Sequence, residues 1–246
     1  MPGRGLLKSH RHRSKGQEVT FIDTTFNMYS DTSAGGDPDA RSPTLRRYHK
    51  LLWSKPLPCG AMFDLDDSGP MPFLRHKSEL GEFKLSSDAI THSYRRTRRI
   101  ADIIGQLSAG EVDQIFDAGA TIGSYTVFPA NRLPGTMTIN GARGCNHKIG
   151  DRFDLTLECI RRHYLRGDNP LSFTLSSYGA FFDLFEDFRG YVNFFLLQDL
   201  VSDDYSKIKF YLPLNSFERA PYPSTVEEYR IYGSGVLEFI AARNRR

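Results

Sequence analysis

The sequence DRFDLTLECIRRHYLRGD, residues 151–168, places hydrophobic residues at helical spacing among acids and arginines. At about 100° per residue, one face of such a helix would hold Phe153, Leu157, Ile160 and Tyr164. The pattern therefore predicts an amphipathic helix over 151–165 with this face buried. It places Leu155 and Arg162 on the opposite, exposed face.

The charges of this helix allow two interpretations. In the structural one, Asp151 complements the dipole at the N-terminus, Glu158 pairs with an arginine one turn later, and Gly167 supplies the left-handed residue that ends the helix. In the functional one, Asp154 and Glu158 lie at the border of the buried face and act as catalytic acid and base. Arg161 would then bind an anionic group.

The segment before the helix strengthens the functional interpretation. TINGARG, residues 138–144, ends a predicted strand and holds Arg143 between two glycines. An arginine and free backbone N–H groups ahead of a helix are suited to binding a phosphate or a carboxylate. On this interpretation the anion-binding residues are Asn140, Arg143, Arg152 and Arg161. The alternative is a turn in which Arg143 pairs with an acid such as Asp151.

The rest of the pattern indicates an α+β fold, because strands and helices do not alternate regularly. Strands are predicted at 18–26, 82–90, 113–117, 123–128, 136–140 and 207–213, with a hairpin turn at 117–125. Helices are predicted at 45–55, 88–107, 151–165, 175–188, 191–201 and from about 225, with Gly190 separating the fourth from the fifth. We expect a mixed or antiparallel sheet, mostly from the first half and residues 207–213, packed by helices of the second half. A disordered basic tail at 1–17 would precede a single domain over 18–246.

The composition excludes several classes of protein. With 32 basic and 29 acidic residues the net charge is only +3, which does not indicate a protein that coats nucleic acid. The three cysteines are widely spaced and indicate no disulfide framework. No hydrophobic run approaches the ~20 residues that span a bilayer, and no signal-peptide pattern follows the basic N-terminus. These features predict a cytoplasmic protein.

Two basic segments are candidates for contact with nucleic acid. In the first, LRRYHKLLWSKP, His49 and Trp53 would contact a base or a nicotinamide ring while neighbouring basic residues bind phosphates. The second is YRRTRR, residues 94–99. The basic residues of the two segments are Arg46, Arg47, Lys50, Arg95, Arg96, Arg98 and Arg99. The alternative is that the aromatic residues belong to the core and the basic residues form a solvated face.

No cofactor is indicated. Cys145 and His147 have metal-like spacing but lack a partner pair, so we expect no metal site. The glycine-containing stretch at 117–125 lacks the spacing of a phosphate-binding loop or of a dinucleotide-binding turn. The cofactor therefore stays unknown.

Four segments together carry a resemblance: SPTLRRYHKLLWSKPLP, TINGARG, DRFDLTLECIRRHY and FFDLFEDFRGYVNFFLLQDLV. Over about residues 20–215 the chain resembles a family of uncharacterised bacterial proteins known only as a domain of unknown function. The resemblance implies a bacterial, cytoplasmic, single-domain protein. It implies no activity and transfers no catalytic residue.

The sequence leads to two function hypotheses. The first is an enzyme that acts on a nucleotide or on a phosphate-containing nucleic-acid substrate, for instance as an NAD-consuming transferase, although no motif demands NAD. The second is a non-enzymatic binding or regulatory protein, such as a partner in a defence or toxin–antitoxin module, which binds nucleic acid through its basic segments. Whether the chain is an enzyme is left open by the sequence.

Overall fold

The computed structural model describes residues 21–33 and 35–246. This part of the chain contains five strands and a larger number of helices, joined by loops. The strands are β1 (Lys55–Pro56), β2 (Met62–Phe63), β3 (Leu74–Ser78), β4 (Gly81–Ala89) and β5 (Tyr125–Pro129). The helices are α1 (Pro38–Arg41), α2 (Pro43–Trp53), α3 (Ala101–Ile104), α4 (Ala109–Gly119), α5 (Ile139–Cys145), α6 (Phe153–Tyr164), α7 (Ser172–Ser177), α8 (Gly179–Asp183), α9 (Phe188–Phe194) and α10 (Val226–Asn244). Single 3-10 turns are η1 (Met28–Asp31), η2 (Arg98–Ile100), η3 (Ile122–Ser124) and η4 (Gln198–Leu200). The predicted α+β fold is confirmed, and the predicted tail at 1–17 lies outside the described residues.

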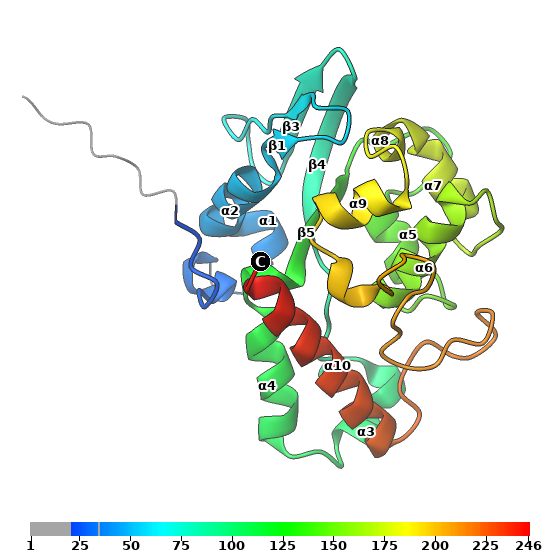
Figure 1. Ribbon diagram of the computed structural model, residues 1–246. Coiled ribbons are helices and arrows are strands. Elements are labelled where there is room, and N and C mark those ends of the chain that lie inside the picture. Colours follow the sequence, from blue (N-terminus) through cyan, green and yellow to red (C-terminus); the bar gives the residue numbers. More distant parts are fainter. Residues whose placement is uncertain (1–20, 34) are drawn as a thin grey trace, which may run out of the picture.

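Strand β4 runs through the middle of the molecule (Figure 1). It pairs antiparallel with β3 on one edge and with β5 on the other, in the registers Leu74↔Leu85 and Ala89↔Tyr125. Helices α1 and α2 lie to one side of this sheet and helices α5 to α9 to the other, while α4 and α10 lie beyond its lower end (Figure 1). All pairings in this sheet are antiparallel, so of the two predicted possibilities, mixed and antiparallel, the second is found.

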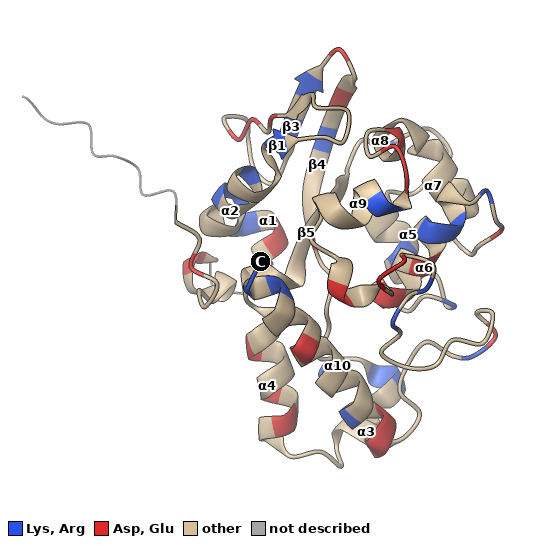
Figure 2. Cartoon of the chain, viewed as in Figure 1, with Lys and Arg blue, Asp and Glu red and all other residues tan. Residues whose placement is uncertain are grey.

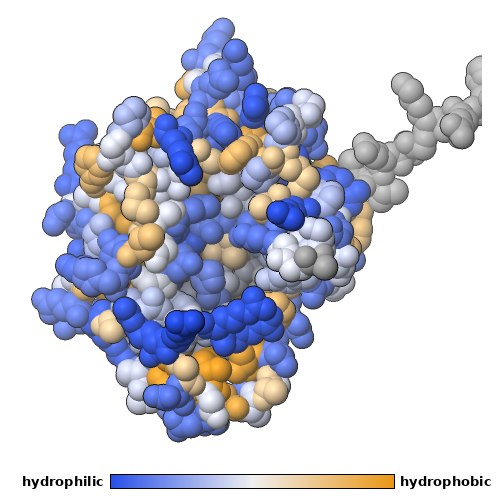
Figure 3. Space-filling model, turned by 180° about the vertical axis from the view of Figure 1, so that it is seen from behind, coloured by the Kyte–Doolittle hydropathy of each residue, from blue (hydrophilic) through white to orange (hydrophobic). Residues whose placement is uncertain are grey.

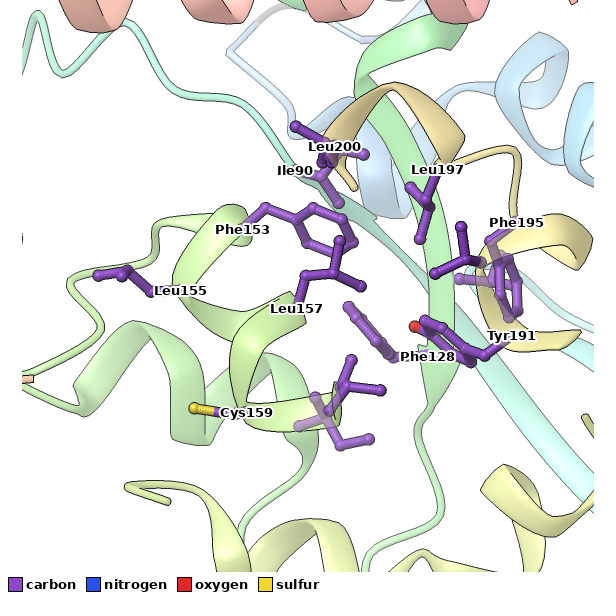
Figure 4. Packing of buried hydrophobic residues seen from close by; sticks show 14 of the residues in the cluster. Ile90, Phe128, Phe153, Leu155, Leu157, Cys159, Tyr191, Phe195, Leu197 and Leu200 are labelled. Carbon is purple, nitrogen blue, oxygen red and sulfur yellow. The ribbon is translucent and has the colours of Figure 1, made fainter. Parts of the chain in front are cut away.

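Helix α6 is buried more completely than its pattern predicts. Every residue from Phe153 to Ile160 is buried. Phe153 and Leu157 point toward the side of α6 on which Phe128 and Tyr191 lie, whereas Leu155 and Cys159 point away from that side (Figure 4). The prediction that Leu155 is exposed was wrong: it is buried, in a helix that packs against both α7 and α9.

Two segments predicted as strands are helical. Residues 113–117 lie within α4, whose N-terminus carries a capping box: the Ser108 side chain accepts from the Glu111 backbone, and the Glu111 side chain accepts from Ser108. Residues 136–140 lead into α5, where the Thr138 hydroxyl accepts from the Gly141 N–H. In both places a helix cap overrides the β-branched composition. The stretch 117–125 is accordingly not a hairpin turn but the passage from α4 through η3 to β5.

Three further predictions of secondary structure were wrong. The predicted helix at 88–107 is replaced by the end of β4, an extended stretch, η2 and α3, because β4 pairs with β5 as far as Ala89. Residues 207–213 form no strand and make a single bridge, Val201↔Ile208, so they do not join the sheet. Residues 21–26 of the predicted strand at 18–26 are irregular, and residues 18–20 lie outside the described part.

Gly190 does not separate two helices but lies inside α9. A Cβ atom at this position would come within 2.0 Å of the Phe185 carbonyl oxygen. A glycine is therefore required for close approach of the backbone, although its helical conformation is ordinary.

Helix α6 ends in a Schellman motif whose left-handed residue is Arg166, with φ 56°, and not Gly167. Gly167 N–H donates to the Arg162 carbonyl over 2.8 Å, and Arg166 N–H donates to the His163 carbonyl over 3.0 Å. We expect Arg166→Gly to raise the free energy of unfolding by about 0.5–1 kcal/mol, because glycine adopts this conformation without a Cβ penalty. Urea denaturation measures the change. Arg166→Ala is the control, since alanine keeps the penalty, and equal stabilisation by both variants would contradict the explanation.

Charged residues of both signs are distributed over most elements and do not separate into an acidic and a basic face (Figure 2). On the face opposite to that of Figure 1, a band of strongly hydrophilic side chains lies directly above a hydrophobic patch (Figure 3). Among the described residues, no helix combines the length and the apolar character needed to cross a membrane.

Candidate active-site cleft

A cleft of about 840 Å³ opens where the end of β4 meets the loop before α1 and the C-terminal half of α4. Its walls carry acids, arginines and aromatic rings. The charged and aromatic residues of the lining are Asp37, Asp39, Asp88, Asp151, His92, Arg95, Arg96, Tyr29, Tyr94, Phe116, Tyr125 and Tyr222. Its volume lies within the range of small-molecule sites.

Asp39 lies at the end of a chain of hydrogen bonds that reaches the cleft from the core. Trp53 Nε1 lies 3.0 Å from His49 Nδ1, His49 Nε2 lies 2.8 Å from Ser87 Oγ, and Ser87 Oγ lies 2.9 Å from Asp39 Oδ1. Trp53, His49 and Ser87 are all buried. Two residues predicted to bind substrate, His49 and Trp53, therefore do not line the cleft but connect to it through Ser87.

His49 is not a base that activates Ser87. Burial, together with the positive charge of Arg243, lowers the pKa of His49 to about 3, so the ring is neutral at physiological pH. The indole N–H of Trp53 is a donor only, which makes Nδ1 of His49 the acceptor and leaves the ring proton on Nε2. Nε2 cannot take a further proton from Ser87, so the pair lacks the chemistry of a serine nucleophile.

The two cleft carboxyls differ in proton affinity. Burial and the negative charges of Asp88 and Asp37 raise the pKa of Asp39 to about 8, against the hydrogen bonds from Ser87 and the Ala89 backbone. Burial also raises the pKa of Asp88, but the Arg143 guanidinium limits the increase to about 6. At neutral pH Asp39 is therefore mostly protonated and Asp88 mostly ionised. The Asp88 side chain keeps 16% of its surface exposed, so it remains accessible from the cleft.

Arg143 holds the acids on the wall of the cleft in place. Its guanidinium is completely buried and bonds the Asp88 carboxylate, and it lies 3.3 Å from Asp151 Oδ1. It also donates to the carbonyls of Ala89 and Asp151 and to the Thr156 hydroxyl. These contacts agree with the alternative interpretation, in which Arg143 pairs with Asp151. Arg143 itself does not line the cleft, whereas its partners Asp88 and Asp151 do.

A histidine and several residues with left-handed backbone lie beside the acids on this wall. His92 Nε2 lies 3.2 Å from Asp151 Oδ2. Tyr94 and Asp151 have left-handed backbone, with φ 55° and 64°. Gly150 is also left-handed, and a Cβ atom there would come within 2.5 Å of Pro221 Cγ. Non-glycine residues in this region cost free energy and are concentrated at functional sites.

Arginines and aromatic rings form the rim of the cleft. The Arg95 guanidinium lies 3.3 Å above the centre of the Phe116 ring, and Phe116 in turn stacks on Tyr29 with 5.2 Å between ring centres. Arg99 lies 5.2 Å from the centre of the Tyr222 ring. Arg96 is exposed. Part of the basic segment 94–99 therefore borders the cleft, as Tyr94, Arg95, Arg96 and Thr97 belong to its lining.

The predicted catalytic residues of α6 are engaged in ion pairs away from the cleft. Asp154 pairs with Arg152 in the core, where Arg152 also donates to two backbone carbonyls. Glu158 accepts from Arg161 over 2.8 Å and from Arg162 over 2.7 Å. Burial alone would raise the pKa of Glu158, but these two arginines bring it below its ordinary value. Glu158 therefore lacks the raised pKa of a proton donor, and both carboxylate oxygens of Asp154 are bonded by Arg152.

The other predicted anion-binding groups are also occupied. Asn140 Nδ2 donates to the Ser87 carbonyl. In the first basic segment, Arg46 donates to the backbone carbonyls of Asp67, Gly69 and Phe73, and Lys50 pairs with the Asp67 carboxylate over 2.7 Å. This segment therefore stabilises the loop around Asp67. Among the described residues, no group of three or more His, Cys, Asp or Glu side chains is arranged to hold a metal ion.

Sequence reasoning did not identify Asp39, Asp88 or His92. A signal for Asp39 exists in DPDARSP, residues 37–43, where Asp37 caps a helix with Pro38 as its first residue and accepts from the Asp39 N–H. Asp88 lies at the end of β4 and His92 lies just beyond it, and the sequence around them contains no motif that would mark them as site residues.

The fold and the cleft together define an α+β protein with paired carboxyls in an arginine-rimmed site. The chain belongs to a family of unknown function (DUF6994), whose family model matches residues 22–246. No curated protein and no solved structure matches the chain.

Proposed function

We propose that the cleft is the active site of an enzyme that acts on a nucleotide or another phosphate-bearing substrate by acid–base catalysis. The observation that carries this proposal is the pair of cleft carboxyls, of which Asp39 has a pKa of about 8 and Asp88 of about 6. Two titratable groups with separated pKa values supply one proton donor and one acceptor at neutral pH.

In this reaction Asp39 gives its proton to the leaving-group atom as the scissile bond breaks. Asp88 takes a proton from the attacking water or hydroxyl, whose oxygen forms the new bond. Each carboxyl then exchanges its proton with solvent through the open cleft. We therefore assign acid–base catalysis to Asp39 and Asp88 in place of Asp154 and Glu158, whose carboxylate oxygens are bonded by arginines.

The rim supports a substrate with an anionic group next to a planar one. Arg95 and Arg96 supply guanidinium donors that match phosphate oxygens. The stacked rings of Tyr29 and Phe116 supply an aromatic wall beside them. Nucleotides combine these two features. The bacterial origin and cytoplasmic location predicted from the sequence stay predictions.

The test is a binding and turnover screen with nucleoside mono-, di- and triphosphates, dinucleotides, nucleotide sugars and single-stranded oligonucleotides. We expect at least one member to bind, and we expect the double variant Arg95→Ala/Arg96→Ala to weaken that binding about tenfold to a hundredfold, since charge-assisted hydrogen bonds are lost. Isothermal titration calorimetry measures the change. Arg132→Ala is the matched control, because Arg132 is exposed and lies outside the cleft lining.

Two results would overturn the proposal. One is a screen in which no member binds, or in which the double variant binds as tightly as the parent protein. The other is binding of an oligonucleotide that is recovered unaltered, which would favour the binding or regulatory protein of the second hypothesis.

A further inference from the structure

We propose that Trp53, His49 and Ser87 are positioning residues that form a one-directional hydrogen-bond chain and thereby keep the proton of Asp39 on Oδ2. The use of this proton in catalysis rests on the proposed function, but the direction of the chain does not. None of the three residues would touch substrate through its chain-forming atoms, because those atoms bond one another and Asp39.

The direction begins at Trp53, whose indole N–H can only donate. It lies 3.0 Å from His49 Nδ1, which must therefore present its lone pair. The neutral imidazole then carries its single proton on Nε2. Arg243 lies beside this pair, with its guanidinium 5.6 Å from the centre of the Trp53 ring, and its charge opposes protonation of His49.

The direction continues through Ser87. His49 Nε2–H donates to Ser87 Oγ over 2.8 Å, so the hydroxyl proton of Ser87 points onward and donates to Asp39 Oδ1 over 2.9 Å. An oxygen that accepts this bond is the carbonyl-like oxygen of a carboxylic acid. The acid proton therefore belongs to Oδ2, the oxygen that Ser87 does not bond.

Water does not compete with this chain, because Trp53, His49 and Ser87 are 0%, 1% and 8% exposed. The other ionisable groups that act on Asp39 are Asp37 in its own loop, Asp88 on β4, and the phenols Tyr29 and Tyr125. The two aspartates favour a protonated Asp39 without choosing between its oxygens. The Asp39 carboxyl also accepts from the Ala89 backbone N–H, and Ser87 is the side chain that bonds one specific oxygen, Oδ1.

The first test uses the parent protein without substrate. Nitrogen-15 NMR distinguishes the tautomers of a histidine ring, and we expect His49 to be the neutral Nε2–H tautomer from pH 5 to pH 9. A protonated His49, or the Nδ1–H tautomer, overturns the proposal.

The second test measures the pKa of Asp39 by carbon-13 NMR in Trp53→Phe and Ser87→Ala. In Trp53→Phe, His49 can adopt the other tautomer and accept from Ser87, which then stops donating to Asp39. In Ser87→Ala the donor is absent. The ionised form of Asp39 loses a hydrogen bond in both variants, so its pKa should rise by about one pH unit.

Phe195→Leu is the matched control, because Phe195 packs 5.2 Å from Trp53 between ring centres and its side chain has no polar atom. An unchanged pKa in both test variants, or the same increase in the control, overturns the proposal. These measurements need no substrate. A correct tautomer and pKa response without any turnover would therefore contradict the proposed function while leaving the chain intact.

Discussion

Replacing Asp154 with alanine is expected to lower the free energy of unfolding by about 3–5 kcal/mol, because it leaves the Arg152 guanidinium buried without its counter-ion. Both side chains are almost completely inaccessible, with 2% of Arg152 and none of Asp154 exposed. Asp154 also accepts from the Tyr211 backbone N–H over 3.0 Å, so the substitution leaves a second donor unsatisfied. Urea denaturation followed by circular dichroism measures the loss.

Two further variants identify the cause. The double substitution Arg152→Met/Asp154→Leu should recover part of the loss, since a hydrophobic pair of similar volume needs no desolvated charge. Glu82→Ala breaks the exposed pair with Lys77, whose charged atoms are 3.7 Å apart, and should change stability by less than about 0.5 kcal/mol. A small effect of Asp154→Ala would show that water reaches this pair, and would reopen Asp154 as a candidate site residue.

Helix α6 illustrates how far a local pattern predicts structure. Hydrophobic spacing located the helix to within two residues, since spacing depends only on the chain itself. It did not predict the burial of Leu155, which depends on the packing of other elements around the helix. The same reasoning missed α4, where the Ser108–Glu111 capping box was present in the sequence but was outweighed by the β-branched residues near it.

The candidate site was harder to predict because its residues come from distant positions. Asp39 and Ser87 are 48 residues apart and Arg143 and Asp88 are 55 apart, so no motif contains either pair. The sequence drew attention to a dense group of charges in α6, but adjacent charges of opposite sign neutralise each other. The acids that matter for the cleft are instead isolated in the sequence, and they acquire their properties from burial and from one another.

Asp39 should also reduce the stability of the fold. Its pKa is about 8 in the folded protein and 3.8 in the ordinary, solvated state. Between these values the folded state binds a proton that the unfolded state does not bind, so stability falls as the pH rises from about 4 to about 8 and then levels off. A side chain that costs stability and lies in a cleft is typical of a functional residue.

Asp39→Asn is therefore expected to abolish most activity and to increase stability at alkaline pH. Once the screen supplies a substrate, turnover should fall about 10²- to 10⁴-fold, because the amide cannot give a proton to the leaving group. The parent's rate should follow a bell-shaped pH profile. It should fall below about pH 6, where Asp88 becomes protonated, and above about pH 8, where Asp39 loses its proton.

The variant's remaining activity should lack the alkaline limb of that profile. Its free energy of unfolding at pH 9 should exceed the parent's by about 1–3 kcal/mol, a difference that is limited because water in the cleft screens part of the charge of the parent's ionised Asp39. The difference should disappear near pH 4. Asp203→Asn, an exposed position outside the cleft, should change neither quantity. Full turnover in Asp39→Asn would remove Asp39 as the proton donor, and a stability difference that does not depend on pH would show that its carboxyl is not desolvated.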